Sequence, residues 1–222
     1  MSGEAIPTMC EPLDRLLGGG IERSIITLVY GEAGSGKTNL CLQLTRNIAL
    51  NGKKVIYIDT EGVSVDRLRQ ISGEDFETVM DNIYFYRSYS FSDQEKNVTS
   101  GIRLARKKKA GLIVLDSATM HLRMTIDDEN RQEKKSLSPQ VSNLMRFAGE
   151  EQIPIILTSQ VYTDGATGEY RPLGGHALLH AAKTILRLDK TTPNHRRAIL
   201  VKHRHMPEMT EAEFVITEHG LV

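Results

Sequence analysis

The sequence contains no tryptophan and only two cysteines, Cys10 and Cys41, among its 222 residues. These cysteines have neither CxxC spacing nor a pairing with histidine in the sequence, so they do not resemble a metal site or a disulfide framework. The scarcity of cysteine therefore argues against a disulfide-rich secreted protein and fits a reducing intracellular compartment.

Long apolar runs are also absent from the sequence. No stretch approaches the ~18 consecutive apolar residues of a membrane-spanning helix. The N-terminus has polar residues and Pro7 where a signal peptide would need its apolar run. We therefore expect a soluble cytoplasmic protein without a membrane partner.

The chain has no excess of charge of either sign, because 28 Lys and Arg residues balance 28 Asp and Glu residues. A neutral chain offers no long-range steering toward nucleic acid. Any binding to DNA would have to come from a local group of cations.

Short apolar runs rich in β-branched residues alternate with amphipathic stretches along the chain, and this order predicts a mainly parallel sheet with helices on both faces. A polar stretch at 162–175 and a short helix then precede three runs that predict a C-terminal antiparallel extension. The length fits a single domain, 1–222. The predicted strands are 25–30, 54–59, 83–86, 112–116, 153–159, 184–189, 197–202 and 213–217, and the longer predicted helices are 39–51, 92–109 and 137–152.

One glycine-rich motif, Gly31 to Thr38, fits the pattern G-x-x-x-x-G-K-[ST] and lies between a predicted strand and a predicted helix. Glycines let the backbone N–H groups of such a phosphate loop turn toward an anion at the positive end of the following helix. The Lys37 ammonium suits the β- and γ-phosphates of ATP, and the Thr38 hydroxyl suits Mg²⁺. The residues predicted to bind nucleotide are Gly31, Glu32, Ala33, Gly34, Ser35, Gly36, Lys37, Thr38 and Asn39.

Three polar residues follow predicted strands and complete the candidate site. Asp116 ends an apolar strand at the sheet edge where ligands gather, so it could hold Mg²⁺ through a water; the alternative is a helix cap. Glu61 is the candidate base for the attacking water, and the alternative is an acidic residue that stabilises the next helix's N-terminus. Gln160 could sense the γ-phosphate or could simply bond to a turn.

These motifs together resemble the RecA/RadA recombinase family. The resemblance rests on the phosphate loop, Glu61, the run 116–119, the run 159–161 and the segments 174–176 and 180–181, and it extends from about residue 11 to residue 222. It implies a RecA-like P-loop NTPase core in which Glu61, Lys37 and Gln160 are catalytic. Full archaeal recombinases also carry an N-terminal helix-hairpin-helix domain, whereas only about ten residues precede the core motif here.

The resemblance implies a weak ATPase that binds ATP and Mg²⁺ and assists homologous recombination and DNA repair without performing strand exchange alone. The implied partners are single-stranded or branched DNA, the main RadA-type recombinase and, at the nucleotide site, a second copy of this chain. Two family loops at about 121–136 and 162–173 would face DNA, through Arg123, Arg131, Tyr162, Tyr170 and Arg171. The residues implied to act between subunits are His180, Lys202 and Arg204, the last two predicted on one face of a strand.

Two other functions fit the same motifs. One is a signalling ATPase or autokinase of the KaiC type, which shares the Lys-x-Arg pattern of residues 202–204 but usually has duplicated domains. The other is a protein-binding module in which nucleotide orders the loops and hydrolysis is incidental. Activity of a Glu61→Gln variant would distinguish the switch from the hydrolase.

Overall fold

The computed structural model describes residues 5–125, 131–165, 168 and 170–222, and the side chains of residues 123–136 lie outside that description. The helices are α1 (Glu11–Leu16), α2 (Lys37–Leu50), α3 (Val65–Ser72), the 3-10 turn η1 (Gly73–Asp75), α4 (Phe76–Met80), α5 (Phe91–Lys108), α6 (Met120–Thr125), α7 (Arg131–Glu151) and α8 (Gly175–Ala181). The strands are β1 (Ile26–Gly31), β2 (Val55–Asp59), β3 (Ile83–Arg87), β4 (Leu112–Asp116), β5 (Ile155–Ser159), β6 (Val161–Thr163), β7 (Tyr170–Pro172), β8 (Thr184–Lys190), β9 (His195–Lys202), β10 (Thr210–Thr217) and β11 (Gly220–Leu221).

Within the described residues, a nine-stranded sheet has the order β11-β10-β9-β8-β1-β5-β4-β2-β3. The six strands from β8 to β3 run parallel to their neighbours, and β8 to β11 continue as an antiparallel meander. The predicted α/β class, the parallel sheet and the C-terminal antiparallel extension are therefore confirmed. Because parallel strands end at one edge, the segments after β1, β2, β4 and β5 meet there.

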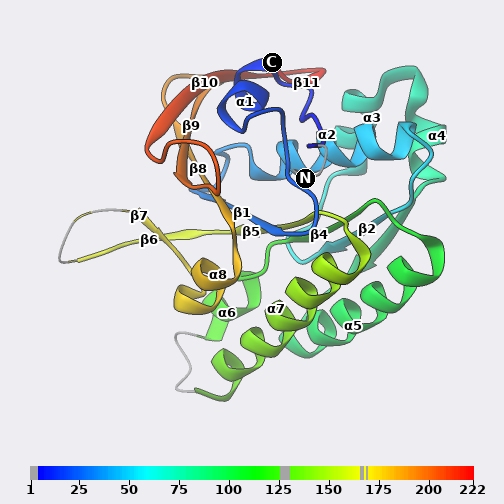
Figure 1. Cartoon of the computed structure of the whole chain (residues 1–222), viewed down its shortest axis with the longest axis vertical. Helices are drawn as coiled ribbons and strands as arrows, with labels where there is room; N and C mark the ends of the chain where they lie inside the picture. Colours follow the sequence, from blue (N-terminus) through cyan, green and yellow to red (C-terminus); the bar gives the residue numbers. More distant parts are fainter. Residues whose placement is uncertain (1–4, 126–130, 166–167, 169) are drawn as a thin grey trace.

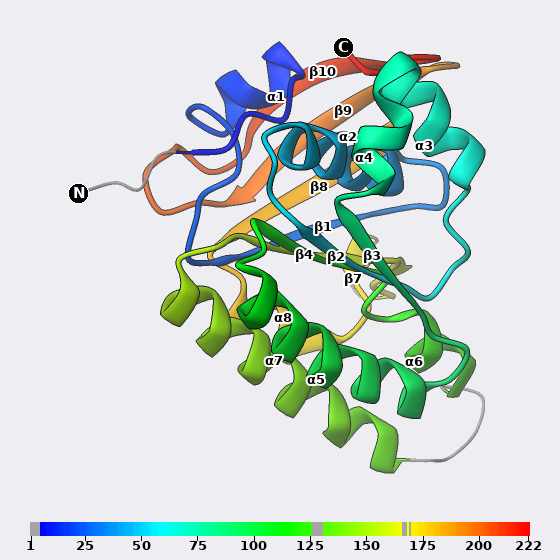
Figure 2. The ribbon, with the colours of Figure 1, turned by 90° about the vertical axis from the view of Figure 1, so that its right-hand side faces the viewer.

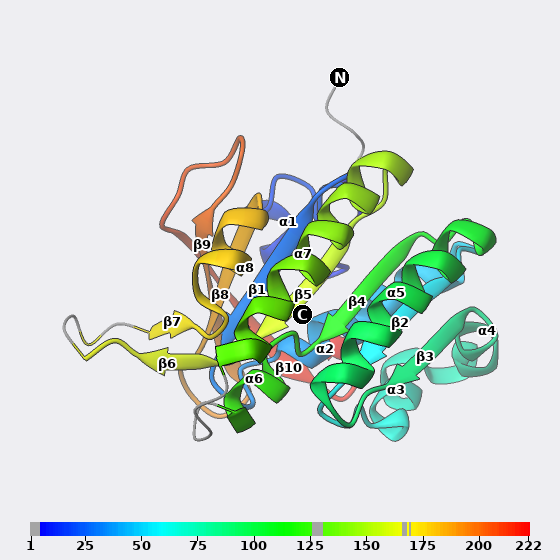
Figure 3. The ribbon, with the colours of Figure 1, turned by 90° about the horizontal axis from the view of Figure 1, so that it is seen from below.

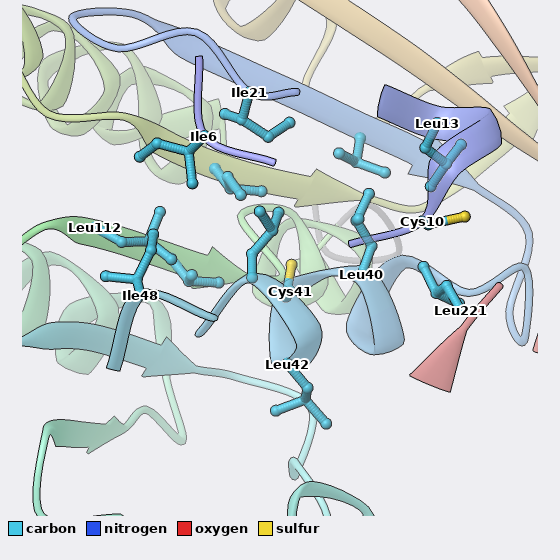
Figure 4. Close-up of a cluster of buried hydrophobic side chains, with 14 of the residues drawn as sticks. Ile6, Cys10, Leu13, Ile21, Leu40, Cys41, Leu42, Ile48, Leu112 and Leu221 are labelled. Atoms are coloured by element: carbon cyan, nitrogen blue, oxygen red, sulfur yellow. The ribbon is translucent and has the colours of Figure 1, made fainter. Parts of the chain in front are cut away.

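Helices cover both faces of this sheet, as Figures 1 and 2 show, with α1 to α4 on one face and α5 to α8 on the other. Successive residues of the inner strands point to opposite faces, so Val55 and Tyr57 enter one core while Ile56 and Ile58 enter the other. Burial on both sides explains why these strands read as continuous apolar runs. Figure 4 shows the first core, where α2 places Leu40 and Cys41 against the sheet and α1.

The helices begin where the sequence offers a suitable cap. The Ser64 hydroxyl accepts a hydrogen bond from Arg67 N at the start of α3, and the Ser90 hydroxyl accepts one from Asp93 N at the start of α5. α5 ends at Lys108, and its C-cap residue Lys109 adopts the left-handed conformation after a run of basic residues. Cations in the last turn of a helix interact favourably with the negative end of its dipole.

Two features of the C-terminal half differ from the prediction. The polar stretch at 162–175 contains a hairpin, β6–β7, which projects from the body of the molecule in Figure 3. β9 ends at Lys202, so Arg204 lies in the following loop and not on one face of the same strand. The period-two argument for Lys202 and Arg204 is therefore wrong, because the strand stops before Arg204.

Candidate functional site

The phosphate loop, residues 31–38, joins β1 to α2 at the carboxyl edge of the sheet. Gly34 and Gly36 have φ angles of +74° and +107°, which L side chains rarely adopt. A Cβ atom on Gly31 would lie 2.2 Å from the Leu188 carbonyl oxygen and 2.7 Å from Ser35 Oγ. The motif's glycines are thus required by the backbone shape and by close packing against β8.

Lys37 lies inside the curve of this loop. Its buried ammonium donates hydrogen bonds to the carbonyl oxygens of Gly31 and Glu32, each at 2.8 Å. Burial lowers the pKa of Lys37, and the nearby carboxylates of Glu61 and Asp116 oppose that shift. The loop therefore holds a desolvated cation with two carboxylates close to it.

Asp116, at the end of β4, is fully buried beneath the loop. Tyr57 Oη donates to Asp116 Oδ2 at 2.8 Å, and Thr158 Oγ1 donates to Asp116 Oδ1 at 2.5 Å. Burial and the Asp116 carboxylate together raise the pKa of Tyr57 well above its usual range. These two donors fix both oxygens of the carboxylate.

Glu61 and Gln160 contact each other directly. Gln160 Nε2 donates a hydrogen bond to Glu61 Oε1 at 2.9 Å, which joins the end of β5 to the loop after β2. Glu61 is exposed to solvent. The backbone carbonyl of Gln160 accepts from Leu173 N at 2.8 Å, at the base of the β6–β7 hairpin. The candidate base, the candidate sensor and the hairpin are thus connected by consecutive hydrogen bonds.

The loop that carries Glu61 is held by Asp59, a residue that the sequence reasoning missed. The Asp59 carboxylate accepts hydrogen bonds from the backbone N–H groups of Glu61 (3.1 Å), Gly62 (2.8 Å) and Val63 (2.9 Å). Arg87, at the end of β3, forms an ion pair with the same carboxylate. An Asp followed within three residues by Gly is a turn signal that could have pointed to this role.

Buried hydroxyl groups connect the ends of β4 and β5. The Thr60 hydroxyl donates to the Ser117 carbonyl at 2.9 Å, and Ser117 N donates back to Thr60 Oγ1 at 2.8 Å. Thr119 Oγ1 lies 3.3 Å from Ser117 Oγ and 3.2 Å from Ser159 Oγ. These hydrogen bonds therefore join the segments that follow β2, β4 and β5, next to Glu61, Asp116 and Gln160.

The β6–β7 hairpin carries three of the predicted DNA-facing residues. Tyr162 and Tyr170 are both exposed, at 45% and 39%. The Tyr170 hydroxyl donates to Glu32 Oε1 in the phosphate loop at 2.9 Å, which raises the pKa of this tyrosine. Arg171 lies opposite Tyr162 in the hairpin and forms an ion pair with Asp164 at 2.9 Å. A groove of about 280 Å³ lies beside this contact and is lined by Glu32 and Ala33 of the phosphate loop and by residues of the hairpin.

The remaining predicted residues lie elsewhere. The side chains of Arg123 and Arg131 are outside the described part of the chain. His180 is on α8, and Lys202 Nζ donates to the carbonyl oxygens of Ala182 (2.8 Å) and Leu179 (3.3 Å) at the end of that helix. Burial lowers the pKa of Lys202, with a further contribution from the neighbouring Lys183. Lys202 thus has a structural role at α8 that the sequence did not indicate.

The chemistry of the loop fits a nucleotide with its metal ion. The Ser35 hydroxyl is buried and has no hydrogen-bond partner among the described atoms. A phosphate in the loop would accept from this hydroxyl and from the backbone N–H groups beside it. Thr38 is half-buried next to Lys37, so its hydroxyl and the Asp116 carboxylate are the residues that could hold Mg²⁺.

Comparisons with known proteins agree with this geometry. The model of the Rad51 family matches residues 4–222. The chain belongs to the Rad51/RecA family. It is 42% identical to the "DNA repair and recombination protein RadB" of Methanococcoides burtonii over 98% of this chain and 97% of the relative. The RadB of Archaeoglobus fulgidus is 38% identical, with 97% of each protein covered.

A solved structure gives the same result. The crystal structure of a RadB recombinase superposes with a TM-score of 0.86 at 36% identity, covering 97% of this chain and 98% of that one. The fold is therefore RecA-like, the predicted resemblance to the RecA/RadA recombinase family is confirmed, and the chain is similar to archaeal RadB recombination and repair proteins. Members of this family are ATPases in general, so nucleotide binding is a property of the family. In the described part of the chain, no helix is both long and apolar enough to span a bilayer.

Proposed function

We propose that this chain binds ATP and Mg²⁺, hydrolyses ATP slowly, and acts as a DNA-binding accessory protein in homologous recombination and repair. The observation that carries the proposal is the hydrogen bond between Gln160 and Glu61. It connects the candidate catalytic carboxylate to the base of the hairpin that holds the exposed tyrosines. ATP would act as a switch whose state reaches the DNA-facing surface.

Each residue of the site would have a separate role in ATP hydrolysis. Lys37, which bonds to the Gly31 and Glu32 carbonyls, would transfer its donors to the β- and γ-phosphate oxygens. Glu61 would orient a water and accept its proton as the water oxygen attacks the γ-phosphorus and the bond to ADP breaks. Mg²⁺, when bound, neutralises developing phosphate charge. Thr38, and Asp116 through a water, would hold that ion.

The proposed switch depends on competition between the Gln160 amide and the attacking water for the Glu61 carboxylate. Glu61 Oε1 accepts from Gln160 Nε2 in this structure. A water held for attack would compete for the same acceptor, so the Gln160 amide would turn toward the γ-phosphate. Its backbone carbonyl accepts from Leu173 N, and a shift there would move the hairpin base. DNA affinity would then depend on the nucleotide.

The hairpin would bind DNA by stacking and by charge. Tyr162 offers an exposed ring for a base, and Arg171 on the opposite strand offers a cation for a phosphate once it leaves Asp164. A RadA-type recombinase and further copies of this chain are the proposed protein partners, with His180, Lys202 and Arg204 as candidate contacts between subunits. The proposal also includes a cytoplasmic location for the protein.

Isothermal titration of ATP and ADP, combined with measurement of phosphate release, tests the core of this proposal. The wild type should bind both nucleotides and release phosphate slowly, and Lys37→Ala should lose both properties. Wild-type protein that binds neither nucleotide would refute the proposal.

A further inference from the structure

Two cations lie side by side next to Gly34 of the phosphate loop, and the mechanism above does not use them. Lys190 is the last residue of β8, and Arg196 is the second residue of β9. The two residues are direct cross-strand partners. A Cβ atom on Gly34 would lie 3.5 Å from Lys190 Cε and 3.6 Å from Lys190 Nζ. Arg196 Nε donates to the Gly34 carbonyl oxygen at 3.1 Å. Both side chains therefore contact the same residue of the loop.

Arg196 also donates to the carbonyl oxygens of Thr192 at 3.4 Å and His195 at 2.7 Å, which are acceptors for its Nη1 group but leave the two like charges uncompensated. Like charges directly opposite each other on neighbouring strands destabilise a sheet. The ion pairs of the described residues include no carboxylate partner for Lys190 or Arg196. The neighbouring Asp189 is already paired with Arg187 at 2.9 Å and with Arg197 at 3.7 Å.

The charge of Lys190 reaches Lys37 on the inside of the loop. Lys190 is among the charges that lower the pKa of Lys37. Glu32, the acidic residue of the loop, accepts its hydrogen bond from Tyr170 instead. The loop thus has Lys190 and Arg196 beside Gly34 in addition to Lys37, whose own charge lies near the carboxylates of Glu61 and Asp116.

We propose that Lys190 and Arg196 form a second phosphate-binding site on the rim of the loop, which binds the terminal phosphate oxygens of a nucleoside triphosphate. The inference rests on the proposed function, because it assumes that ATP occupies the loop. Lysine reaches along a flexible four-carbon stem, and arginine presents a planar fork suited to phosphate. A γ-phosphate would relieve the repulsion between the two cations, so this rim would favour ATP over ADP.

The test measures the affinities of β,γ-imido ATP and ADP by isothermal titration for Lys190→Gln, with Lys53→Gln as the matched control. Lys53 is an exposed lysine in the loop before β2, at the opposite edge of the sheet. Lys190→Gln should weaken the triphosphate analogue by about tenfold, the loss of one charge-assisted contact, and ADP by less than about twofold. Lys53→Gln should change neither affinity. Combining Lys190→Gln with Arg196→Gln should weaken the analogue further.

Other results would overturn the inference. They are unchanged affinity for the analogue, or an equal loss for the analogue and ADP. Unchanged nucleotide affinity with weaker DNA binding in fluorescence anisotropy would assign these cations to the DNA backbone instead. If Lys37→Ala abolishes binding of both nucleotides while Lys190→Gln has no effect, this inference fails and the proposed function stands. If the wild type binds neither nucleotide, the proposed function itself fails.

Discussion

Gln160 Nε2 donates a 2.9 Å hydrogen bond to Glu61 Oε1, across 99 positions of sequence, and so joins the ends of β5 and β2. The two residues follow β2 and β5, and β4 lies between these strands in the sheet. A carboxylate suited to activate water is therefore bonded to an amide that adjoins the β6–β7 hairpin. This contact explains how one residue could affect both turnover and the DNA-facing surface.

Glu61→Gln should lower the rate of phosphate release by about 10²- to 10⁴-fold, because the amide cannot accept the proton of the attacking water. Affinity for a non-hydrolysable ATP analogue should stay within about twofold, since Glu61 does not hold the phosphates. Single-turnover phosphate release and isothermal titration measure the two quantities. Glu74→Gln, an exposed carboxylate in η1, is the control. Full activity in Glu61→Gln would remove this residue from the mechanism.

Asp59→Asn should destabilise the protein by about 2–4 kcal/mol, because the amide loses the charge and replaces the oxygen that accepts from Val63 N and Arg87 with an NH2 donor. Turnover should fall with it, since Asp59 positions the loop of Glu61. Urea unfolding gives the free energy. Asp66→Asn, in the exposed first turn of α3, should change it by less than about 0.5 kcal/mol. Equal stability of the two variants would contradict this role.

The pH dependence of stability should reveal the buried ammonium of Lys37. Burial lowers its pKa, so the unfolded chain keeps this proton at pH values where the folded protein has released it. The free energy of unfolding therefore gains a component as pH rises from that lowered pKa to the unfolded value of about 10.4. Lys37→Met removes this component.

Urea unfolding of nucleotide-free wild type and Lys37→Met, at several pH values in that alkaline range, measures the effect. The stability of the wild type relative to the variant should increase with pH. A difference that does not change with pH would show that the ammonium is not desolvated.

Glu32→Gln should lower the pKa of Tyr170 toward its ordinary value of about 10, because the hydroxyl would no longer donate to a carboxylate. A pH titration of the tyrosine ring signals by NMR measures it, and Tyr162, whose hydroxyl has no such contact with Glu32, gives the internal reference. A Tyr170 pKa that is identical in the two proteins would show that the hairpin does not rest on the phosphate loop in solution.

The sequence predicted most of the parallel sheet because buried strands and amphipathic helices have distinct periods. The strand predicted at 112–116 is β4 in full, and the phosphate loop lies where its motif predicts. The edge position of Asp116 and Gln160 followed from the shared direction of the strands.

Contacts between distant segments could not be predicted in this way. The hydrogen bonds of Asp59 to its own turn depend on backbone geometry, and its ion pair with Arg87 depends on the pairing of β2 with β3. The β6–β7 hairpin is short and polar, so no apolar alternation marked it. The loop position of Arg204 reflects the end of β9, and strand ends are poorly determined by local sequence.

The central claim is that ATP controls DNA binding through Gln160. The direct test is fluorescence anisotropy of labelled single-stranded and branched DNA at several salt concentrations, without nucleotide, with ADP and with a non-hydrolysable ATP analogue. We predict salt-sensitive binding that changes with nucleotide in the wild type, is weaker in Arg171→Ala, and no longer responds to nucleotide in Gln160→Ala. DNA binding that is the same in every nucleotide state, or absent from all of them, would contradict the account.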